Sequence, residues 1–149
     1  MDCPPALGLL TINAMAAADS VIVPVEAHGI ALEGIADLTD TIAQVRDAEL
    51  NPDLQLLAVL ACRVNRTRQA REVAEFLETT FPNEALRTRI HENARLGEAF
   101  NFRRTVLQYA PESSGAVEYR AAASELLARV TRLDNRQVLV GAAGTAGGR

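Results

Sequence analysis

Residues 2–27, DCPPALGLLTINAMAAADSVIVPVEA, carry the strongest indication of the fold class. The stretch opens on Asp2, followed by a cysteine and two prolines, a combination typical of the point where a strand ends. A short helical pattern follows at residues 6–18, and residues 19–27 form a β-branched apolar run. Such a run predicts a buried strand. The stretch therefore predicts a strand end, a helix and a strand in succession.

The rest of the chain continues this alternation. A second apolar run at residues 54–62 predicts another buried strand, and residues 86–90 predict a third, shorter one. Apolar side chains recur at spacings of three and four in the segments that we expect to be longer helices, residues 31–46, 73–81 and 119–133. Strands that are apolar throughout and alternate with helices are typical of a parallel sheet covered on both faces. The predicted fold class is α/β.

The composition is that of one globular domain. The chain has 149 residues, of which 48% are hydrophobic and 23% charged, and no apolar run approaches the roughly 20 residues that cross a bilayer. We expect a domain over residues 1–133 and a disordered tail over residues 134–149, where the Gly/Ala-rich end lacks periodicity. No secretion signal is evident, which favours a cytoplasmic location and reduced thiols at Cys3 and Cys62; a disulfide between them stays an alternative.

Charge is distributed unevenly along the chain. Residues 1–62 hold one arginine against nine acidic residues, whereas residues 63–104 hold nine arginines against six. A basic middle in a chain of net charge −4 indicates a face for a polyanion. The chain contains no lysine, so no chemical step that needs a lysine ammonium can be performed by its residues.

Several long motifs in collinear order resemble the ParA-type partition ATPases, the deviant Walker family that includes MinD. The segments DCPPALG, LTINA, AADSVIVPV and ALEG at residues 2–34 resemble consensus segments of that family. Residues 92–119, ENARLGEAFNFRRTVLQYAPESSGAVEY, resemble a second conserved block and the start of its final helix. The resemblance covers residues 1–130 and implies the C-terminal part of a P-loop NTPase fold, a partial doubly wound parallel sheet with flanking helices.

The resemblance also implies where ATP and Mg²⁺ bind. It makes Asp2 the carboxylate that helps to hold Mg²⁺ through water, a suitable role because Mg²⁺ prefers oxygen ligands and α/β proteins bind ligands at strand ends. Asn65, His91 and Asn93 align with positions near the adenine. His91 replaces the proline that family members commonly have in the base pocket, and a surface position without contact to the base is an equal alternative for it. From the residues alone, Asn65 has an equal alternative role, in a loop that leads to a helix capped by Thr67.

Two arginines align with residues that ParA-type dimers use to hold DNA without sequence preference. These are Arg66 and Arg95, and guanidinium groups suit phosphate oxygens. The candidate neighbours are Arg63, Arg68, Arg71, Arg103 and Arg104. The alternative is a solvated face, with Arg66 and Arg71 placed near Glu75 as helix pairs.

The family's Gly-rich phosphate loop does not occur in this sequence, and without lysine it cannot. We therefore expect the chain alone not to hydrolyse ATP. The resemblance implies the C-terminal portion of an ATPase of plasmid or chromosome partition, which dimerises with ATP, coats nucleoid DNA and responds to a ParB-type partner. One alternative is a non-enzymatic paralogue that binds a full-length ATPase or DNA. Another is a MinD-like ATPase at a membrane surface, which the Gly/Ala-rich end of the chain does not favour.

Overall fold

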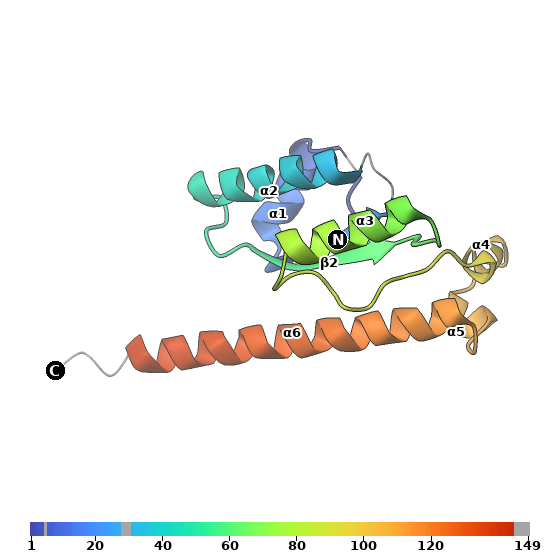
Figure 1. Ribbon diagram of the computed structural model, residues 1–149. Helices are drawn as coiled ribbons and strands as arrows, with labels where there is room; N and C mark the ends of the chain where they lie inside the picture. Colours follow the sequence, from blue (N-terminus) through green and yellow to red (C-terminus); the bar gives the residue numbers. More distant parts are fainter. Residues whose placement is uncertain (5, 28–30, 145–149) are drawn as a thin grey trace.

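The computed structural model describes residues 1–4, 6–27 and 31–144 (Figure 1). It confirms the α/β class, with a small parallel sheet and flanking helices. The elements in chain order are α1 (Leu9–Ala17), β1 (Ser20–Glu26), α2 (Ala31–Asp47), β2 (Gln55–Cys62), α3 (Arg68–Thr80), α4 (Ala94–Asn101), α5 (Val106–Tyr109) and α6 (Ser114–Gly144).

The two predicted buried strands form the sheet. β1 and β2 pair in parallel from Ser20 opposite Gln55 to Glu26 opposite Cys62, with one irregularity between Val21 and Ile22. A parallel pair needs a long crossover, which α2 provides. Within the described residues β1 pairs with β2 alone, so its other edge is free.

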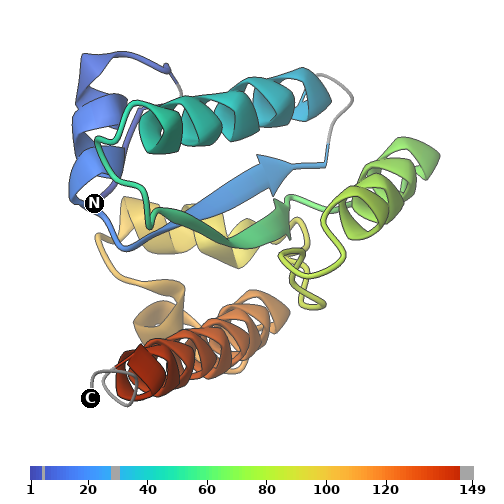
Figure 2. The same ribbon diagram turned by 90° about the vertical axis from the view of Figure 1, so that its left-hand side faces the viewer.

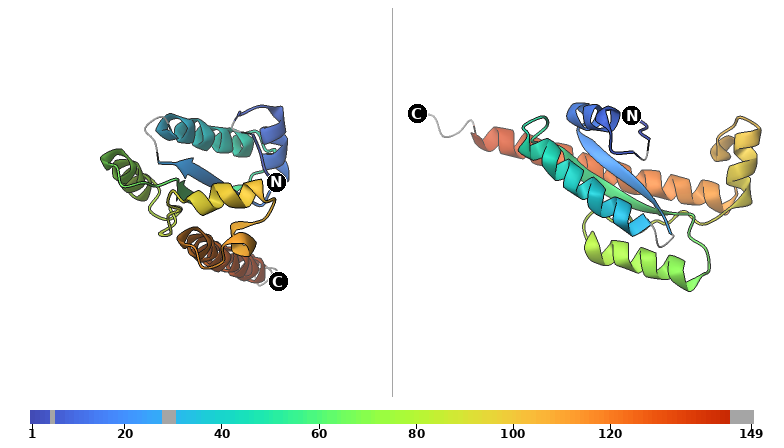
Figure 3. Two further views of the ribbon diagram at one scale, coloured as in Figure 1. Left: turned by 90° about the vertical axis from the view of Figure 1, so that its right-hand side faces the viewer. Right: turned by 90° about the horizontal axis from the view of Figure 1, so that it is seen from above.

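Helices cover both faces of β2, as its continuous apolar run predicts. β1, which we also predicted to be buried, is buried at Val25 alone, and its Ile22 is 45% exposed. Figure 2 shows α2 and α3 on one side of the strands and α6 on the other. The core of the first side joins Val25 and Val59 of the strands to Ile35 of α2 and to Val73 and Leu77 of α3. On the second side, residues of β2 meet α6 at Ala122 and the segment after α3, at Leu86 and Ile90. Seen from above, α6 runs along the length of the molecule (Figure 3).

The prediction of a third strand at residues 86–90 is wrong. The segment follows β2 and is bonded to it at two points, where Leu86 N donates to Val59 O and Ile90 N donates to Ala61 O, both at 2.9 Å. Between these points the segment advances four residues while β2 advances two, which no regular ladder permits. The amides of Arg87 and Thr88 turn instead to the carboxylate of Glu125 on α6, at 3.0 and 3.1 Å.

α6 is joined to the sheet by one long side chain. The guanidinium of Arg129 donates to the carbonyl oxygens of Leu57, Glu84 and Ala85 at 3.1, 2.6 and 2.7 Å, and it pairs with Glu125 at 3.3 Å. Beyond the predicted helix end at residue 133, the helix continues through Gly144, where we expected a disordered tail from residue 134. No proline interrupts that stretch. Residues 145–149 lie outside the described residues, and the domain boundary at residue 133 stays a prediction.

Candidate functional site

The carboxyl ends of the strands carry a charged cluster. Arg63 follows β2 in a left-handed backbone conformation, with φ of 52°. Its guanidinium pairs with Glu26, the last residue of β1, at 3.2 Å and with Glu92 at 3.6 Å. All three side chains are more than half exposed, so the cluster is screened by solvent. It places a cation between two carboxylates at the edge where α/β proteins bind ligands.

Asn65 lies in the loop between β2 and α3. Its Oδ1 accepts hydrogen bonds from the backbone amide of Thr67 at 3.1 Å and from the Thr67 hydroxyl at 2.6 Å. Thr67 in turn caps α3 by accepting from the amide of Ala70 at 3.2 Å. The structure thus confirms the capped helix that was the alternative for Asn65. The side-chain amide nitrogen of Asn65 makes no bond within the described residues, so its role toward adenine stays a prediction.

His91 is tied to α6 by two hydrogen bonds. Its backbone amide donates to Glu118 Oε2 at 2.8 Å, and its ring Nδ1 lies 2.8 Å from Glu118 Oε1. The imidazole side chain is 54% exposed. Glu118 therefore fixes the ring at the surface, with the opposite nitrogen left toward solvent.

Asn93 begins α4. Its Oδ1 accepts from the amide of Arg95 at 2.9 Å, and its Nδ2 donates to the hydroxyl of Ser114, the first residue of α6, at 2.8 Å. This side chain joins the starts of two helices. It lies two residues from His91, and Val64 bridges to His91 from the end of β2. The structure therefore places Asn65, His91 and Asn93 at the same end of the sheet.

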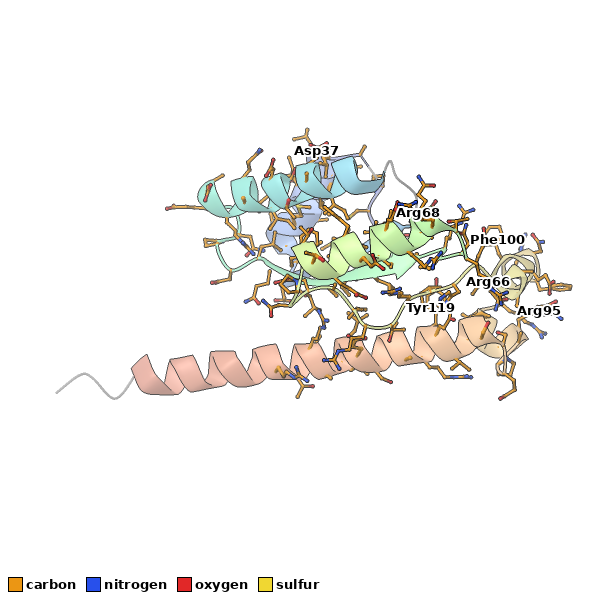
Figure 4. The ribbon with its side chains drawn as sticks, in the orientation of Figure 1. Asp37, Arg66, Arg68, Arg95, Phe100 and Tyr119 are labelled. Carbon is orange, nitrogen blue, oxygen red and sulfur yellow. The ribbon has the colours of Figure 1, made fainter. Side chains whose placement is uncertain are left out.

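The two arginines predicted to hold DNA also lie at this end. Figure 4 shows Arg66, Arg95 and Phe100 where the loop after β2 approaches α4. Arg66 is exposed and forms no ion pair within the described residues, whereas Arg95 Nη1 pairs with Glu98 Oε2 at 2.6 Å. Arg68 pairs with Glu72 across one turn of α3 at 2.7 Å. The pairing that we kept as the alternative, of Arg66 and Arg71 with Glu75, does not form among the described residues, whereas Arg95 and Arg68 each pair with an acidic residue of their own helix.

Asp2 lies elsewhere. Residues 1–4, with α1, β1 and α2, line a cavity of about 480 Å³ beside the free edge of β1. Asp2 is exposed, and none of the three predicted nucleotide residues lines this cavity. The N-terminus is beside α1 in Figure 2. The structure does not bring Asp2 together with Asn65, His91 and Asn93.

The described residues do not form a complete site for Mg²⁺ or ATP. They contain no group of three histidine, cysteine or acidic side chains placed to hold a metal ion. Mg²⁺ is commonly bound through one or two carboxylates together with phosphate oxygens, so Asp2 fits the part of one ligand. The chain has no Gly-rich phosphate loop and no lysine to hold those phosphates.

Aromatic residues of this end were missed by sequence reasoning. The rings of Phe102 and Tyr109 stack with centroids 5.1 Å apart and planes inclined by 18°. Phe100 is 83% exposed. The signal was present, because residues 100–104 read FNFRR and interleave aromatic with basic side chains.

Comparison with known proteins finds relatives among chromosome-partitioning ATPases. The chain is 47% identical over 131 residues to the chromosome-partitioning ATPase Soj of Thermus thermophilus, covering 87% of this chain and 52% of that protein. The chain is a homologue of the ParA-type partition ATPases. The chromosome partitioning protein ParA of Myxococcus xanthus is 39% identical, over 88% of this chain and 46% of its own length. The family described as AAA domain matches residues 1–56.

Solved structures show the same fold. Cobyrinic acid a,c-diamide synthase from Mycobacterium smegmatis, solved with bound ADP and magnesium, has a TM-score of 0.64 at 32% identity, over 85% of this chain and 44% of that one. Apo McdA of Cyanthece shares the fold with a TM-score of 0.71 at 16% identity, over 84% and 51% of the two chains. This ParA-like chain thus spans about half the length of the proteins that it matches. Within the described residues, no helix combines the length and apolar character that a membrane span requires.

Proposed function

We propose that this chain acts in plasmid or chromosome partition as the C-terminal portion of a ParA-like ATPase, through ATP-dependent dimerisation and non-specific DNA binding on the nucleoid. The observation that carries the proposal is the 47% identity to a chromosome-partitioning ATPase, spread over 87% of this chain. The placement of Arg66 and Arg95 at the end that also holds Asn65, His91 and Asn93 supports it.

In this proposal the chain contributes the base-binding end of the nucleotide site. Asn65 is held by hydrogen bonds from Thr67, Asn93 by the bond with which it caps α4, and His91 by Glu118. Side chains fixed in this way are positioned before a ligand arrives, which lowers the entropy lost on binding. Asp2 supplies a carboxylate to the hydration shell of Mg²⁺, and bound Mg²⁺ neutralises phosphate charge.

The phosphate-binding half is expected from a further segment that docks at the free edge of β1. That edge offers unpaired backbone groups, and the cavity beside it is lined by residues 1–4, α1 and α2. Leu9 and Leu10 of α1 are 79% and 74% exposed, an apolar surface that such a segment would cover. A strand added there would pair with β1. A homodimer, or a dimer with a longer ParA-like subunit, and a ParB-type partner complete the proposed assembly.

DNA binding is assigned to Arg66 and Arg95, with the other arginines of residues 63–104 as neighbours. Phosphate contacts give affinity without sequence preference and a steep dependence on salt. Each arginine that contacts a phosphate adds about 0.9 to the slope of log affinity against log salt.

The test uses a protein in which this chain is joined to the phosphate-loop half of the Thermus thermophilus relative. Binding of a fluorescent duplex is measured with ATP across a salt series, for the parent and for Arg95→Glu and Arg66→Glu. Arg132→Glu on α6 is the charge-matched control. We expect weaker binding and a shallower slope for the first two variants and not for the control. Equal affinity and slope in all four proteins would contradict the DNA assignment.

A second candidate function is a binding module without catalysis, which pairs with a longer ATPase or occupies DNA. The absence of lysine and of a Gly-rich loop from these 149 residues favours it. The genomic DNA upstream of the Met1 codon distinguishes the two. An in-frame sequence that encodes a lysine-containing Gly-rich loop supports the ATPase, and an in-frame stop codon supports the binding module.

A further inference from the structure

The end of the molecule formed by α4 and α5 presents aromatic rings to solvent among arginines. Phe100 is 83% exposed and Phe102 is 63% exposed, values that are high for the largest apolar side chains. Arg103 and Arg104 follow directly and are also exposed. We call these four residues, Phe100, Phe102, Arg103 and Arg104, the aromatic–arginine surface.

The Phe102 ring of this surface is held in place from behind. Phe102 stacks on Tyr109, whose hydroxyl donates to Glu98 at 3.1 Å. The backbone turns sharply after the ring, with Arg103 at φ of 52° and its amide bonded to the carbonyl of Phe100 at 2.9 Å. Stacking on Tyr109 covers one face of Phe102 and leaves its other side open, so a second planar group can continue the stack.

The charge of this surface is uncompensated. Neither Arg103 nor Arg104 forms an ion pair with any described residue, and the nearby carboxylate of Glu98 is paired with Arg95 at 2.6 Å. An occupant that complements the surface must therefore be anionic and must present flat apolar faces. A single-stranded nucleic acid has both, because its bases are unstacked and its phosphates repeat along the strand. A duplex offers phosphates and base edges but no open base faces, because its bases are stacked within the helix.

We propose that the aromatic–arginine surface binds single-stranded nucleic acid, with bases stacked on Phe100 and Phe102 and phosphates held by Arg103 and Arg104. This goes beyond the proposed function, which concerns ATP and the phosphates of duplex DNA and includes Arg103 and Arg104 only as neighbours of Arg66 and Arg95. Because stacking occurs on any base, little sequence preference is expected.

The experiment measures fluorescence anisotropy of labelled dT20 and of a 20-base-pair duplex with the 149-residue chain, at low salt and without nucleotide. The variants are Phe100→Leu, Phe102→Leu and the pair Arg103→Glu with Arg104→Glu. Phe76→Leu is the matched control, because Phe76 is a phenylalanine on α3 that is 41% exposed. Leucine keeps the apolar volume and removes the aromatic face. Circular dichroism and light scattering are recorded for every variant.

We expect the parent to bind dT20 more tightly than the duplex. Each leucine variant of the surface should weaken dT20 binding by roughly tenfold, as loss of one stacked base does, with the duplex little changed. The double arginine variant should weaken both, and the control neither. The proposal is overturned by unchanged dT20 binding in the leucine variants, by equal binding of strand and duplex, or by no measurable dT20 binding. It is also overturned if the leucine variants change the oligomeric state, which would make this surface an interface between copies. None of these results depends on the ATP-linked duplex binding of the proposed function.

Discussion

Arg95 and Glu98 form an ion pair across one turn of α4, with 2.6 Å between Nη1 and Oε2. The hydroxyl of Tyr109 donates to the same carboxylate oxygen at 3.1 Å. The hydrogen bond to Glu98 raises the pKa of the Arg95 guanidinium, and the one from Arg95 lowers the pKa of the Glu98 carboxyl. The arginine assigned to DNA is therefore already paired, and a phosphate must compete with Glu98 for it.

Removing this competitor should strengthen DNA binding. We expect Glu98→Gln in the joined protein to raise duplex affinity by up to about fivefold at low salt, the scale of an exposed ion pair. The slope of log affinity against log salt should steepen by up to about 0.9. Asp40→Asn on α2 removes the same charge from an exposed position outside this cluster and is the control. Fluorescence anisotropy across a salt series measures the affinity and its slope. An equal gain in duplex affinity in both variants would show that only the net charge of the protein matters.

The sheet could be predicted from the sequence because its strands are apolar throughout. The path of residues 86–90 could not be predicted, because it depends on Glu125, which lies 37 or 38 residues away along the chain. The carboxylate of Glu125 accepts hydrogen bonds from the amides of Arg87 and Thr88. Thr67 was foreseen as a helix cap because such signals are local. The stack of Phe102 on Tyr109 and the bonds of Glu118 to His91 were not, because they depend on how α4, α5 and α6 meet.

Glu125 should stabilise the fold over most of the pH range. Burial raises its pKa, but the amides of Arg87 and Thr88 and the charge of Arg129 outweigh this, so the pKa is lowered overall. Stabilisation by a carboxylate with a lowered pKa is fully present above its ordinary pKa and is lost as pH falls through the lower value. We expect Glu125→Gln to reduce the free energy of unfolding by about 1–3 kcal/mol at pH 7. Urea unfolding at pH 7 and pH 3 measures this.

The matched control for that experiment is Glu112→Gln, at an exposed position before α6. The difference between Glu125→Gln and the parent should shrink at pH 3, where the carboxyl approaches protonation in both states. A difference of the same size at both pH values would mean that charge on Glu125 does not contribute.

The two cysteines should differ sharply in reactivity. Both thiols are free, and Cys3 is exposed. Burial, together with the charge of Glu26, raises the pKa of Cys62 to about 11 from an ordinary 9.0. Because the thiolate is the reactive form, Cys62 should be alkylated by iodoacetamide at pH 8 at least roughly a hundredfold more slowly than Cys3. Mass spectrometry of timed samples measures both rates. If Cys3 and Cys62 were alkylated at equal rates in the folded chain, and urea did not change these rates, the burial of Cys62 would be contradicted.

The isolated chain should associate through α1 and the free edge of β1. Leu9 and Leu10 are exposed there, and an unpaired strand edge invites pairing with another chain. Replacing both leucines by glutamine should lower the mass measured by light scattering at high concentration. Leu127→Gln is the control, since Leu127 is 67% exposed on α6. A parent that stays monomeric at all concentrations would argue against this surface.

ATP hydrolysis tests the central claim most directly, because a partial site cannot stabilise the charge that shifts between the β- and γ-phosphates. Phosphate release is measured with Mg²⁺ and duplex DNA for the 149-residue chain, for the phosphate-loop half of the Thermus thermophilus relative, and for the two together. We expect each component alone to release phosphate no faster than buffer does. The mixture should hydrolyse ATP, and Asp2→Ala should abolish this turnover. Turnover by the 149-residue chain alone that Asp2→Ala removes would contradict the account, as would a mixture no more active than its parts.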